Sequence, residues 1–543
     1  MRGRWKYLSL AWGLALGLAV RAAAQDEAVL RAAMYLTGCA AEEELDPDVV
    51  DRLEALAGRK IRVNGAHLRP SLLLSEYQLA SLADYRSRSG DILSWEELAL
   101  VDGFSRETVA VLRPFLSLES SRLPGQVRDS SAGRWQGKAL LRTTLKQVGA
   151  KGRVGGEKWQ LQGAWRDGGG SFSGVWEGGR YRLLAGHFNL RFGQGLGVWT
   201  GFSMENLSTL DAFVRRPTGI SPVWSYNPSG LPLGLACAAS WGRLQTQLFA
   251  TRDRSGGLRA DWFSLRAQAG LTLRAAPGDW LLSVDGRYSL GKALWVAEAA
   301  LRHHSAGAKV SLTLPLGNDF RLALQARAMP SRFTAKKYGE YALAAGLGYR
   351  SERRRAGGEP LFSASCTADA ALLPVPGADP RRFQLRLYAL AAAQLSDTWS
   401  LETRLTERYR NYETARTDLR ADLKSLRGPW SGVFWAEAVH AGHWGFLSYL
   451  EGGYKREALW AYLRLTGFVI DHWDERIYCY ERDAPGNFSV PAYAGRGLSA
   501  SLAGGYKHRL KRSTLRAHLR AAWMVRIGRP PTPTLNLQLQ WER

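Results

Sequence analysis

Cysteine is scarce in this chain, and so are long apolar runs. The 543 residues contain four cysteines, Cys39, Cys237, Cys366 and Cys479, and no Cys-x-x-Cys pair. This scarcity excludes a dense disulfide scaffold and a zinc finger. No long uncharged apolar run follows residues 8–20, which excludes a protein that crosses a membrane with several helices.

The chain is instead rich in aromatic residues, glycine and positive charge. It has 21 Trp, 20 Tyr, 58 Gly and a formal net charge of +24. Hydrophobic residues at 45% and charged residues at 22% exclude a wholly disordered chain. The length exceeds that of one ordinary soluble domain, so we expect at least two structural units.

Residues 1–24 have the pattern of a secretory signal peptide. Arg2, Arg4 and Lys6 form a charged start, residues 7–20 are apolar, and three alanines at 22–24 precede Gln25. The alternative is an uncleaved membrane anchor, but the run is short and ends in a small-residue cleavage site. We therefore predict an exported protein whose mature chain begins at Gln25.

Residues 25–118 follow a helical period. Val29, Leu30, Ala33, Met34 and Leu36 recur at spacings of three and four, as do the apolar residues at 49, 50, 53 and 56. A Ser-, Arg- and Gly-rich linker follows at 119–133. The pattern predicts a small all-α domain ahead of the linker.

From residue 134 to 543 the period is two. Between 515 and 527 the odd positions are apolar, whereas Arg516, His518, Arg520 and Arg526 occupy even positions. Segments 320–328, 383–389 and 535–541 alternate in the same way. Successive side chains of a strand point to opposite faces, so each segment has one apolar wall and one polar wall.

This alternation fits a soluble β-sandwich or a transmembrane β-barrel. Segments of 9–15 residues, a polar face rich in Arg, and Trp or Tyr near segment ends favour the barrel. The predicted fold class is therefore mainly β, with a large transmembrane antiparallel barrel at 134–543. At roughly 18–22 residues per strand and turn, we expect about 18–22 strands. Residues 200–232 and 472–496 are candidates for external loops or an internal plug.

The two regions carry opposite charge. Residues 25–118 contain ten Arg and Lys against 16 Asp and Glu, so their net charge is −6, and the predicted barrel holds the positive excess. An Arg-rich lumen suggests anionic solutes or polyanions. The simpler alternative, which we favour, is that these arginines pair with Asp and Glu across the lumen or contact lipopolysaccharide phosphates at the rim.

Residues 74–118 resemble a helix-hairpin-helix module of the type found in competence DNA receptors. The resemblance lies in segments 75–79, 84–86, 94–98, 101–104 and 112–116, with Gly90 and Thr108. The whole plan is similar to outer-membrane proteins of Bacteroidetes-type bacteria, in which a periplasmic helix-hairpin-helix region precedes a large barrel. The Gly-rich segment 191–196 is similar to one in that group.

The residues themselves indicate how such a hairpin works. Ser94 and Glu97 form a predicted capping box, and Gly103 lies where a tight turn needs a positive φ. Backbone N–H groups after the turn can bind a phosphate oxygen. The candidate contact residues for phosphate, DNA or a protein partner are Gly103, Phe104, Ser105, Arg106, Arg86, Arg88 and Arg113.

Several departures favour a protein contact over DNA. Ser105 replaces the second hairpin glycine, and Asp102 and Glu107 flank the turn. These carboxylates and the net −6 charge repel a polyanion. We expect a structural or protein-binding module, with DNA binding as the alternative.

No motif predicts an enzyme, a metal site or a cofactor. Gly193, Gly195 and Gly197 suggest a nucleotide loop but lie among strands, where glycine permits close backbone approach or a bulge. Asp471, His472 and Asp474 lack the further ligands that a metal site needs.

We expect an outer-membrane protein of a Gram-negative bacterium, with a periplasmic N-terminal domain that acts as an adaptor. The function expected is transport, a channel or envelope assembly; the alternative is DNA uptake. Its expected partners are outer-membrane lipid, an unidentified periplasmic protein and, in the alternative, DNA.

Overall fold

The computed structural model describes most of the chain beyond residue 27. The described residues are 28–57, 60–65, 68, 73–120, 135–156, 158–200, 206–264, 266–302, 304–334, 338–351, 360–375, 382–456, 458–487 and 489–543. The predicted signal peptide and nearly all of the predicted linker lie outside these residues.

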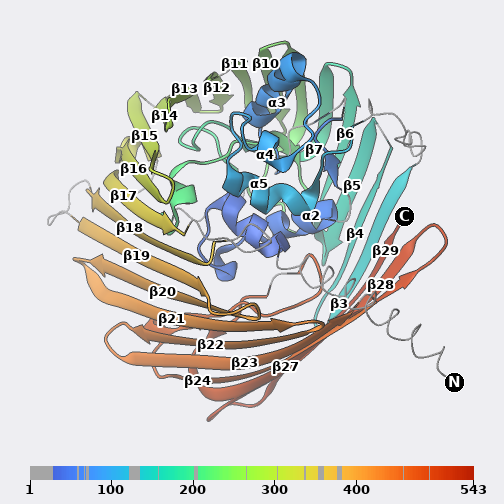
Figure 1. The fold of residues 1–543 in the computed structure, drawn as a ribbon, viewed down its shortest axis with the longest axis vertical. Coiled ribbons are helices and arrows are strands. Elements are labelled where there is room, and N and C mark those ends of the chain that lie inside the picture. Colours follow the sequence, from blue (N-terminus) through green and yellow to red (C-terminus); the bar gives the residue numbers. More distant parts are fainter. Residues whose placement is uncertain are drawn as a thin grey trace.

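A closed antiparallel barrel of 24 strands forms most of the molecule (Figure 1), which confirms the predicted fold class. The strands of its first part are β3 Gln136–Thr144, β4 Val148–Gly155, β5 Trp159–Arg166, β6 Gly169–Gly178, β7 Tyr181–Arg191, β9 Leu233–Trp241, β10 Leu244–Thr251, β11 Gly256–Phe263, β12 Ala267–Ala276, β13 Asp279–Leu290, β14 Ala293–Arg302 and β15 Ser305–Leu316. Those of its second part are β16 Phe320–Met329, β17 Glu340–Arg350, β18 Phe362–Leu373, β19 Arg382–Gln394, β20 Trp399–Arg410, β21 Glu413–Arg427, β22 Trp430–His440, β23 Trp444–Arg456, β24 Leu459–Ile470, β27 Gly495–Arg509, β28 Thr514–Arg526 and β29 Thr532–Glu542. Each strand pairs with the next, and β29 closes on β3 with Leu539 opposite Leu141.

The strand number exceeds the expected 18–22. Several connections consist of two residues, such as Gly179-Arg180 between β6 and β7 and Gly291-Lys292 between β13 and β14. Both glycines have positive φ, 56° and 58°, which lets the chain reverse in so short a turn. Strand and turn together therefore take fewer residues than the sequence estimate assumed.

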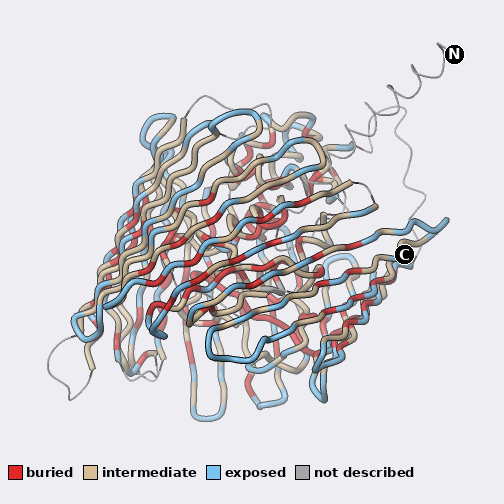
Figure 2. Tube along the Cα trace, turned by 90° about the horizontal axis from the view of Figure 1, so that it is seen from below, coloured by how far each residue is buried: buried red, intermediate tan, exposed pale blue. Residues whose placement is uncertain are grey.

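The predicted alternation is confirmed on β28. Leu515, Leu519 and Trp523 are exposed on the outside, whereas His518 and Arg520 are buried on the inside. Figure 2 shows buried and exposed residues alternating along many strands. An apolar outer wall around a polar interior is the arrangement of a membrane-spanning barrel.

A compact helical module, residues 28–120, precedes the barrel. Its elements are a helix at 28–37, η1 Glu42–Glu44, α2 Pro47–Ala57, β1 Ile61–Arg62, α3 Glu76–Ser89, α4 Trp95–Leu98, α5 Arg106–Leu112, η2 Arg113–Phe115 and β2 Leu116–Ser117. β1 and β2 pair in parallel, and one apolar core joins all the helices. This confirms the helical periodicity read from the sequence. No helix among the described residues has the length and apolarity to cross a bilayer.

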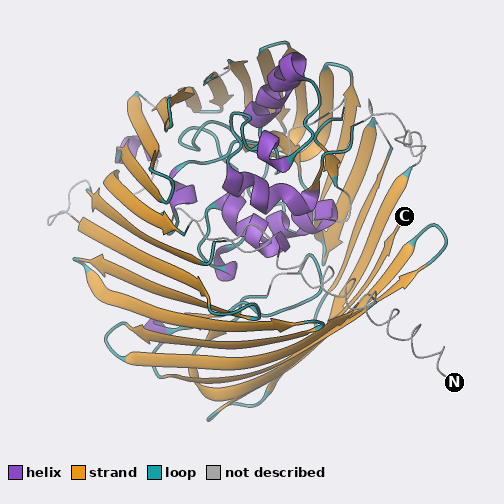
Figure 3. Ribbon diagram, in the orientation of Figure 1, coloured by secondary structure: helices purple, strands orange, loops and turns teal. Residues whose placement is uncertain are grey.

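The helical module lies inside the barrel (Figures 1 and 3), with contacts to the inner wall that are described below. Sequence analysis predicted a periplasmic domain ahead of the barrel and did not foresee a position in the lumen. Two long connections also fold inward. The first inward loop, residues 192–232, contains η3 Leu210–Phe213 and β8 Gly219–Pro222; the second, residues 471–494, contains η4 Trp473–Glu475, β25 Ile477–Tyr478 and β26 Ala492–Tyr493. Of the two alternatives for these loops, the internal plug is confirmed.

The barrel wall contacts the first inward loop near the middle of the loop. Phe213 packs against Ala323 and Ala344, and its carbonyl accepts a hydrogen bond from Gln325 at 2.9 Å. The second loop is held in the same way, because Gln538 donates to the carbonyl of Pro485 at 2.9 Å. Both loops leave the barrel at the end opposite the start of β3 and the end of β29, and both contact the inner wall.

Candidate functional site: the helical module in the lumen

Carboxylates of the helical module meet arginines of the barrel wall. Glu107, in the first turn of α5, pairs with Arg350 of β17 and lies 3.5 Å from Nη1 of Arg321 on β16. Arg321 also pairs with Asp211 of the first inward loop at 2.9 Å. One wall arginine thus links the module and the loop.

A second charged contact holds another side of the module. Glu43, in η1, pairs with Arg420 of β21 at 3.0 Å and accepts a hydrogen bond from the backbone N–H of Tyr480 at 3.2 Å. Burial opposes ionisation of this carboxyl, but Arg420 and Arg404 outweigh it and lower the pKa of Glu43. The Glu43 contact is therefore an ion pair at neutral pH.

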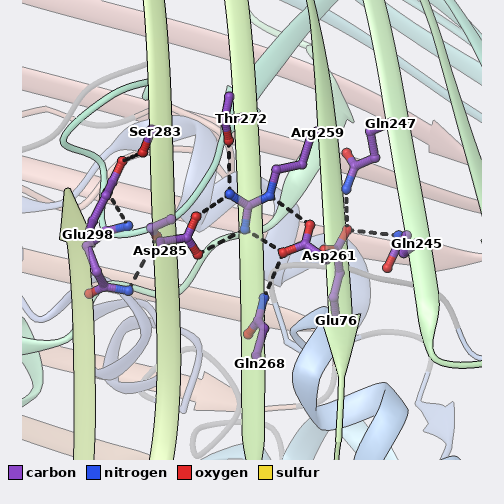
Figure 4. Close-up of polar contacts among 12 residues, drawn as sticks. Glu76, Gln245, Gln247, Arg259, Asp261, Gln268, Thr272, Ser283, Asp285 and Glu298 are labelled. Carbon is purple, nitrogen blue, oxygen red and sulfur yellow. Dashed lines mark hydrogen bonds and ion pairs between the residues drawn. The ribbon is translucent and has the colours of Figure 1, made fainter. Parts of the chain in front are cut away.

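Glu76 makes a neutral contact instead. Its Oε1 accepts hydrogen bonds from Gln245 at 3.0 Å and Gln247 at 2.8 Å, both on β10 (Figure 4). Burial, together with the nearby Asp261, raises the pKa of Glu76 to about 8. The carboxyl is thus mainly protonated at neutral pH while the module is docked.

Polar and aromatic contacts complete the interface. Arg52 of α2 donates to the carbonyl of Pro222 at 3.1 Å, and Thr209 donates to the carbonyl of Gly38 at 2.8 Å. Arg287 of β13 lies over the ring of Tyr77, 4.2 Å from its centroid. These contacts come from the wall and the first inward loop together.

Buried charges elsewhere on the wall are paired within the barrel. Arg259 of β11 binds Asp261 through Nε at 2.7 Å and Asp285 of β13 through Nη2 at 3.0 Å, and Thr272 accepts a further bond at 2.9 Å (Figure 4). Arg464 of β24 binds Glu451 of β23 in the same way, at 2.6 Å. Lumen arginines at these positions thus pair with acids, as we favoured, but the partners lie on the same or nearby strands of the wall rather than across the lumen.

The Gly-rich segment of the first inward loop binds a carboxylate. The backbone N–H groups of Gln194, Leu196 and Gly197 donate to Glu298 of β14 at 2.6, 3.0 and 3.0 Å, and the Ser283 hydroxyl donates at 2.7 Å. Gly193 has φ 55°, and a Cβ there would lie 2.8 Å from Oε2 of Glu298. The glycines therefore permit close backbone approach, as expected, and they hold the loop to the wall.

The predicted hairpin residues Gly103, Phe104 and Ser105 make their contacts within the helical module. Gly103 has φ 83°, as the turn requires, and its carbonyl accepts from Gln78 at 2.9 Å. Phe104 is buried in the core of the module, and Ser105 caps α5 by accepting from the N–H of Thr108 at 3.0 Å. Ser94 caps α4 as predicted, but Glu97 accepts from the N–H of Leu93 rather than from that of Ser94.

The four candidate arginines do not converge. Arg86 donates to the carbonyls of Asn64 and Gly65 at 2.9 Å each, and Arg88 pairs with Asp84 at 2.7 Å. Arg113 lies 5.4 Å from the centroid of the Trp95 ring, whereas Arg106 is exposed at the start of α5. Arg86 thus braces the module internally, and no contact recorded for these four reaches the wall.

A cavity of about 320 Å³ separates the hairpin from the wall. Its lining includes Tyr77, Asp102 and Gly103 of the module and Arg287 and Arg321 of the wall. Tyr77 donates its hydroxyl to Asp102, and burial raises the pKa of this tyrosine to about 12. The hairpin edge therefore faces the inside of the barrel.

Sequence reasoning missed the docking carboxylates Glu43 and Glu76 and assigned Glu107 only a repulsive role. The available signal was the charge difference between the two regions, which we took to favour a protein partner. In the structure these carboxylates contact the barrel wall of the same chain.

No protein-family model matches the chain. No curated protein matches its sequence. Several solved barrels resemble it in structure. The P pilus usher (PapC) translocation pore has 8% identity and a TM-score of 0.35, over 75% of this chain and 98% of that chain. The copper transporter OprC has 10% identity and a TM-score of 0.41, over 75% and 80%. The outer-membrane protein OpdK of Pseudomonas aeruginosa has 8% identity and a TM-score of 0.29, over 76% and 98%. At this level of similarity we infer the function from the contacts of this chain alone.

Proposed function

We propose that the chain is an outer-membrane transport barrel whose own N-terminal module closes the lumen. The observation that carries the proposal is the docking of acidic side chains of the module on wall arginines, Glu107 on Arg321 and Arg350, and Glu43 on Arg420. Opposite charges across the interface fix its register and favour docking inside the lumen over solution.

The interface is suited to reversible closure. Its contacts are mainly ion pairs and hydrogen bonds. The buried residues of the module's apolar core all come from the module, and Tyr480 of the second inward loop packs against them. Polar interfaces between domains of one chain resemble transient interfaces between proteins. The module can therefore leave the wall as a folded unit, and solute passage follows its release.

The proposed location is the outer membrane of a Gram-negative bacterium. An even strand number puts the start of β3 and the end of β29 at one end of the barrel, which we call the termini end. The two long connections leave from the other end. In bacterial barrels short turns are periplasmic and long loops are external, so we place the termini end, and the entry of the helical module, on the periplasmic side.

Conductance of the full-length protein in planar bilayers tests the proposal. We expect small currents from the wild type and larger ones from Glu43→Lys with Glu107→Lys, because each substitution puts like charges together at the interface. The control is Glu96→Lys with Glu119→Lys, which makes the same charge change at exposed positions of the module. Equal conductance of the two variants would contradict the proposal.

An adaptor role and DNA binding are the alternatives for the module. Glu107 contacts the wall and the hairpin edge faces a cavity inside the barrel, so a DNA duplex can reach that edge only after release. Binding of duplex DNA by the Glu43→Lys, Glu107→Lys protein but not by the wild type would favour this alternative. Those substitutions add positive charge, so Glu96→Lys with Glu119→Lys again serves as the control.

A further inference from the structure

Exposed basic residues occupy many of the turns at the termini end of the barrel. They come from six connections and from the end of β21, and they are Lys158, Arg180, Arg243, Arg266, Lys292, Arg427, Lys511 and Arg512. We call this set the basic ring. The acidic residues described in turns at that end are Asp319 and Asp397. The ring therefore gives this edge of the barrel a net positive charge.

A belt of exposed aromatic residues lies next to the basic ring. Its members stand near the strand ends that lead into the same turns: Trp159, Trp176, Tyr181, Trp241, Trp262, Tyr288, Trp295, Phe320, Phe362, Trp399, Trp430 and Tyr506. Some members touch across strands, such as Tyr181 and Trp241, with centroids 6.4 Å apart. Amphipathic rings of this kind settle at the headgroup level of a bilayer.

The order along the chain fixes the order along the membrane normal. Lys158 is followed directly by Trp159, and Arg180 by Tyr181, while Arg243 comes two residues after Trp241. Each cation thus lies just beyond an aromatic residue, farther from the apolar wall. That is the depth of the lipid phosphates if the belt marks the boundary of the hydrocarbon.

The other end of the barrel has a smaller excess in its described turns: the cations are Lys146, Arg252, Arg254, Arg332 and Arg529, and the acids are Asp167 and Asp253. Arg252 and Arg254 there flank Asp253, and Asp167 follows Arg166. In the second inward loop, Asp471 pairs with Arg496 at 2.7 Å. Both ends are thus basic, and the excess is larger at the termini end, where the eight cations of the ring stand against two acids.

We propose that the basic ring binds the headgroups of anionic glycerophospholipids in the leaflet at the termini end. Lys and Arg near an anionic leaflet are attracted to it within a Debye length. The ring presents them along the barrel edge from β4 to β14, and again beside β21 and between β27 and β28. The inference rests on the barrel spanning a membrane and is independent of whether the helical module gates it.

Native mass spectrometry of the detergent-solubilised full-length protein tests the inference. The probes are dioleoyl phosphatidylglycerol and, as the neutral reference, dioleoyl phosphatidylcholine. The ring variant carries Arg180→Gln, Arg243→Gln, Arg266→Gln and Lys292→Gln, which neutralise four consecutive turns at the termini end. The matched control carries Lys146→Gln, Arg252→Gln, Arg332→Gln and Arg529→Gln, which remove four exposed cations from the other end.

We expect the ring variant to bind phosphatidylglycerol at least tenfold more weakly than wild type, with phosphatidylcholine binding unchanged. The control should bind both lipids as the wild type does. Equal loss in both variants, or no loss in the ring variant, would overturn the inference. If the ring variant does not fold, salt titration of the wild type decides: added NaCl must weaken binding of phosphatidylglycerol but not of phosphatidylcholine. Retention of duplex DNA on the ring, unaffected by phosphatidylglycerol, would also overturn it.

Discussion

The carboxylate of Glu107 lies 3.5 Å from the guanidinium of Arg321, across 214 positions of the sequence. Glu107 belongs to the first turn of α5 and Arg321 to β16, so the pair joins the helical module to the barrel wall. Both side chains are partly buried, 21% and 28% exposed, which weakens screening by solvent. The attraction between these two charges therefore contributes to keeping the module docked in the lumen.

A charge swap tests this pair. Glu107→Arg should release the module, because it faces Arg321 and Arg350 with a like charge. Adding Arg321→Glu should restore part of the docking, because it recreates one ion pair. Protease cleavage of the linker at 119–133 in the folded protein measures release. Faster cleavage in the double variant than in the single variant would contradict a direct interaction.

The pH dependence of docking should follow Glu76. The pKa of Glu76 is about 8 when the module is docked, against 4.5 for a Glu side chain in water, so the undocked module loses this proton first as the pH rises. The contribution of protonated Glu76 to the stability of docking is complete below pH 4.5 and is lost as the pH rises through 8. Release should therefore increase between pH 5 and pH 8.5.

Glu76→Gln is the matched variant. The amide keeps an acceptor for Gln245 and Gln247 and carries no titrating proton. Cleavage of the linker should depend less on pH in this variant than in the wild type. An unchanged pH profile would show that another group controls release.

Glu298 should hold the first inward loop. Replacing it with Ala removes the acceptor of three backbone N–H groups and the Ser283 hydroxyl, and bonds to a charged group contribute about 1.5–3 kcal/mol each. We expect faster hydrogen exchange at Gln194, Leu196 and Gly197, with barrel strands far from β14 unchanged. Uniform exchange throughout the barrel would indicate global destabilisation instead.

Leu519→Arg should disrupt membrane assembly by about 2–4 kcal/mol if the residue lies near the midplane. Leu519 is exposed on the outer wall, whereas Arg516, on the lumen side, pairs with Glu542 at 3.1 Å at a partly exposed position. Arg516→Ala is therefore the control and should fold normally. Heat-modifiability on a gel reads out folding, and equal effects of both substitutions would contradict the assignment of the faces.

Gly103→Val should unfold the helical module without unfolding the barrel. A β-branched residue resists the φ of 83°, and its Cβ would lie 3.1 Å from the ring of Tyr77. Loss of helical signal with normal heat-modifiability of the barrel is the expected result. Unchanged protease resistance of residues 28–120 would count against the tight turn.

The strands could be predicted because their signal is local. β28 and β29 contain the predicted segments with period-two alternation, and Ser94 and Gly103 take the predicted roles in a cap and a turn. The strand number was underestimated because a turn of two residues, such as a Gly and the residue beside it, is hard to recognise in the sequence. The signal peptide lies outside the described residues, and the resemblance to helix-hairpin-helix modules stays a prediction.

The position of the module could not be predicted, because alternation tells which face a side chain takes but not what it meets. Arg321 was correctly placed on a polar face, yet its partners Glu107 and Asp211 are more than 100 residues away. Arg520 illustrates the consequence. Sequence analysis treats it as an ordinary lumen residue, but it pairs with the buried Glu481 of the second inward loop, so Arg520→Ala should loosen that loop.

Cross-linking in native membranes tests most directly whether the module occupies the lumen. Cysteines replace Glu107 and Arg350, which form an ion pair, in a chain whose four natural cysteines are changed to serine. A short bismaleimide should join positions 107 and 350 within one chain and shift its mobility on a denaturing gel. The control pair, with cysteines at Glu96 and Arg350, should react much less. Efficient cross-linking of the control, or none between 107 and 350, would contradict a module docked on β17 inside the barrel.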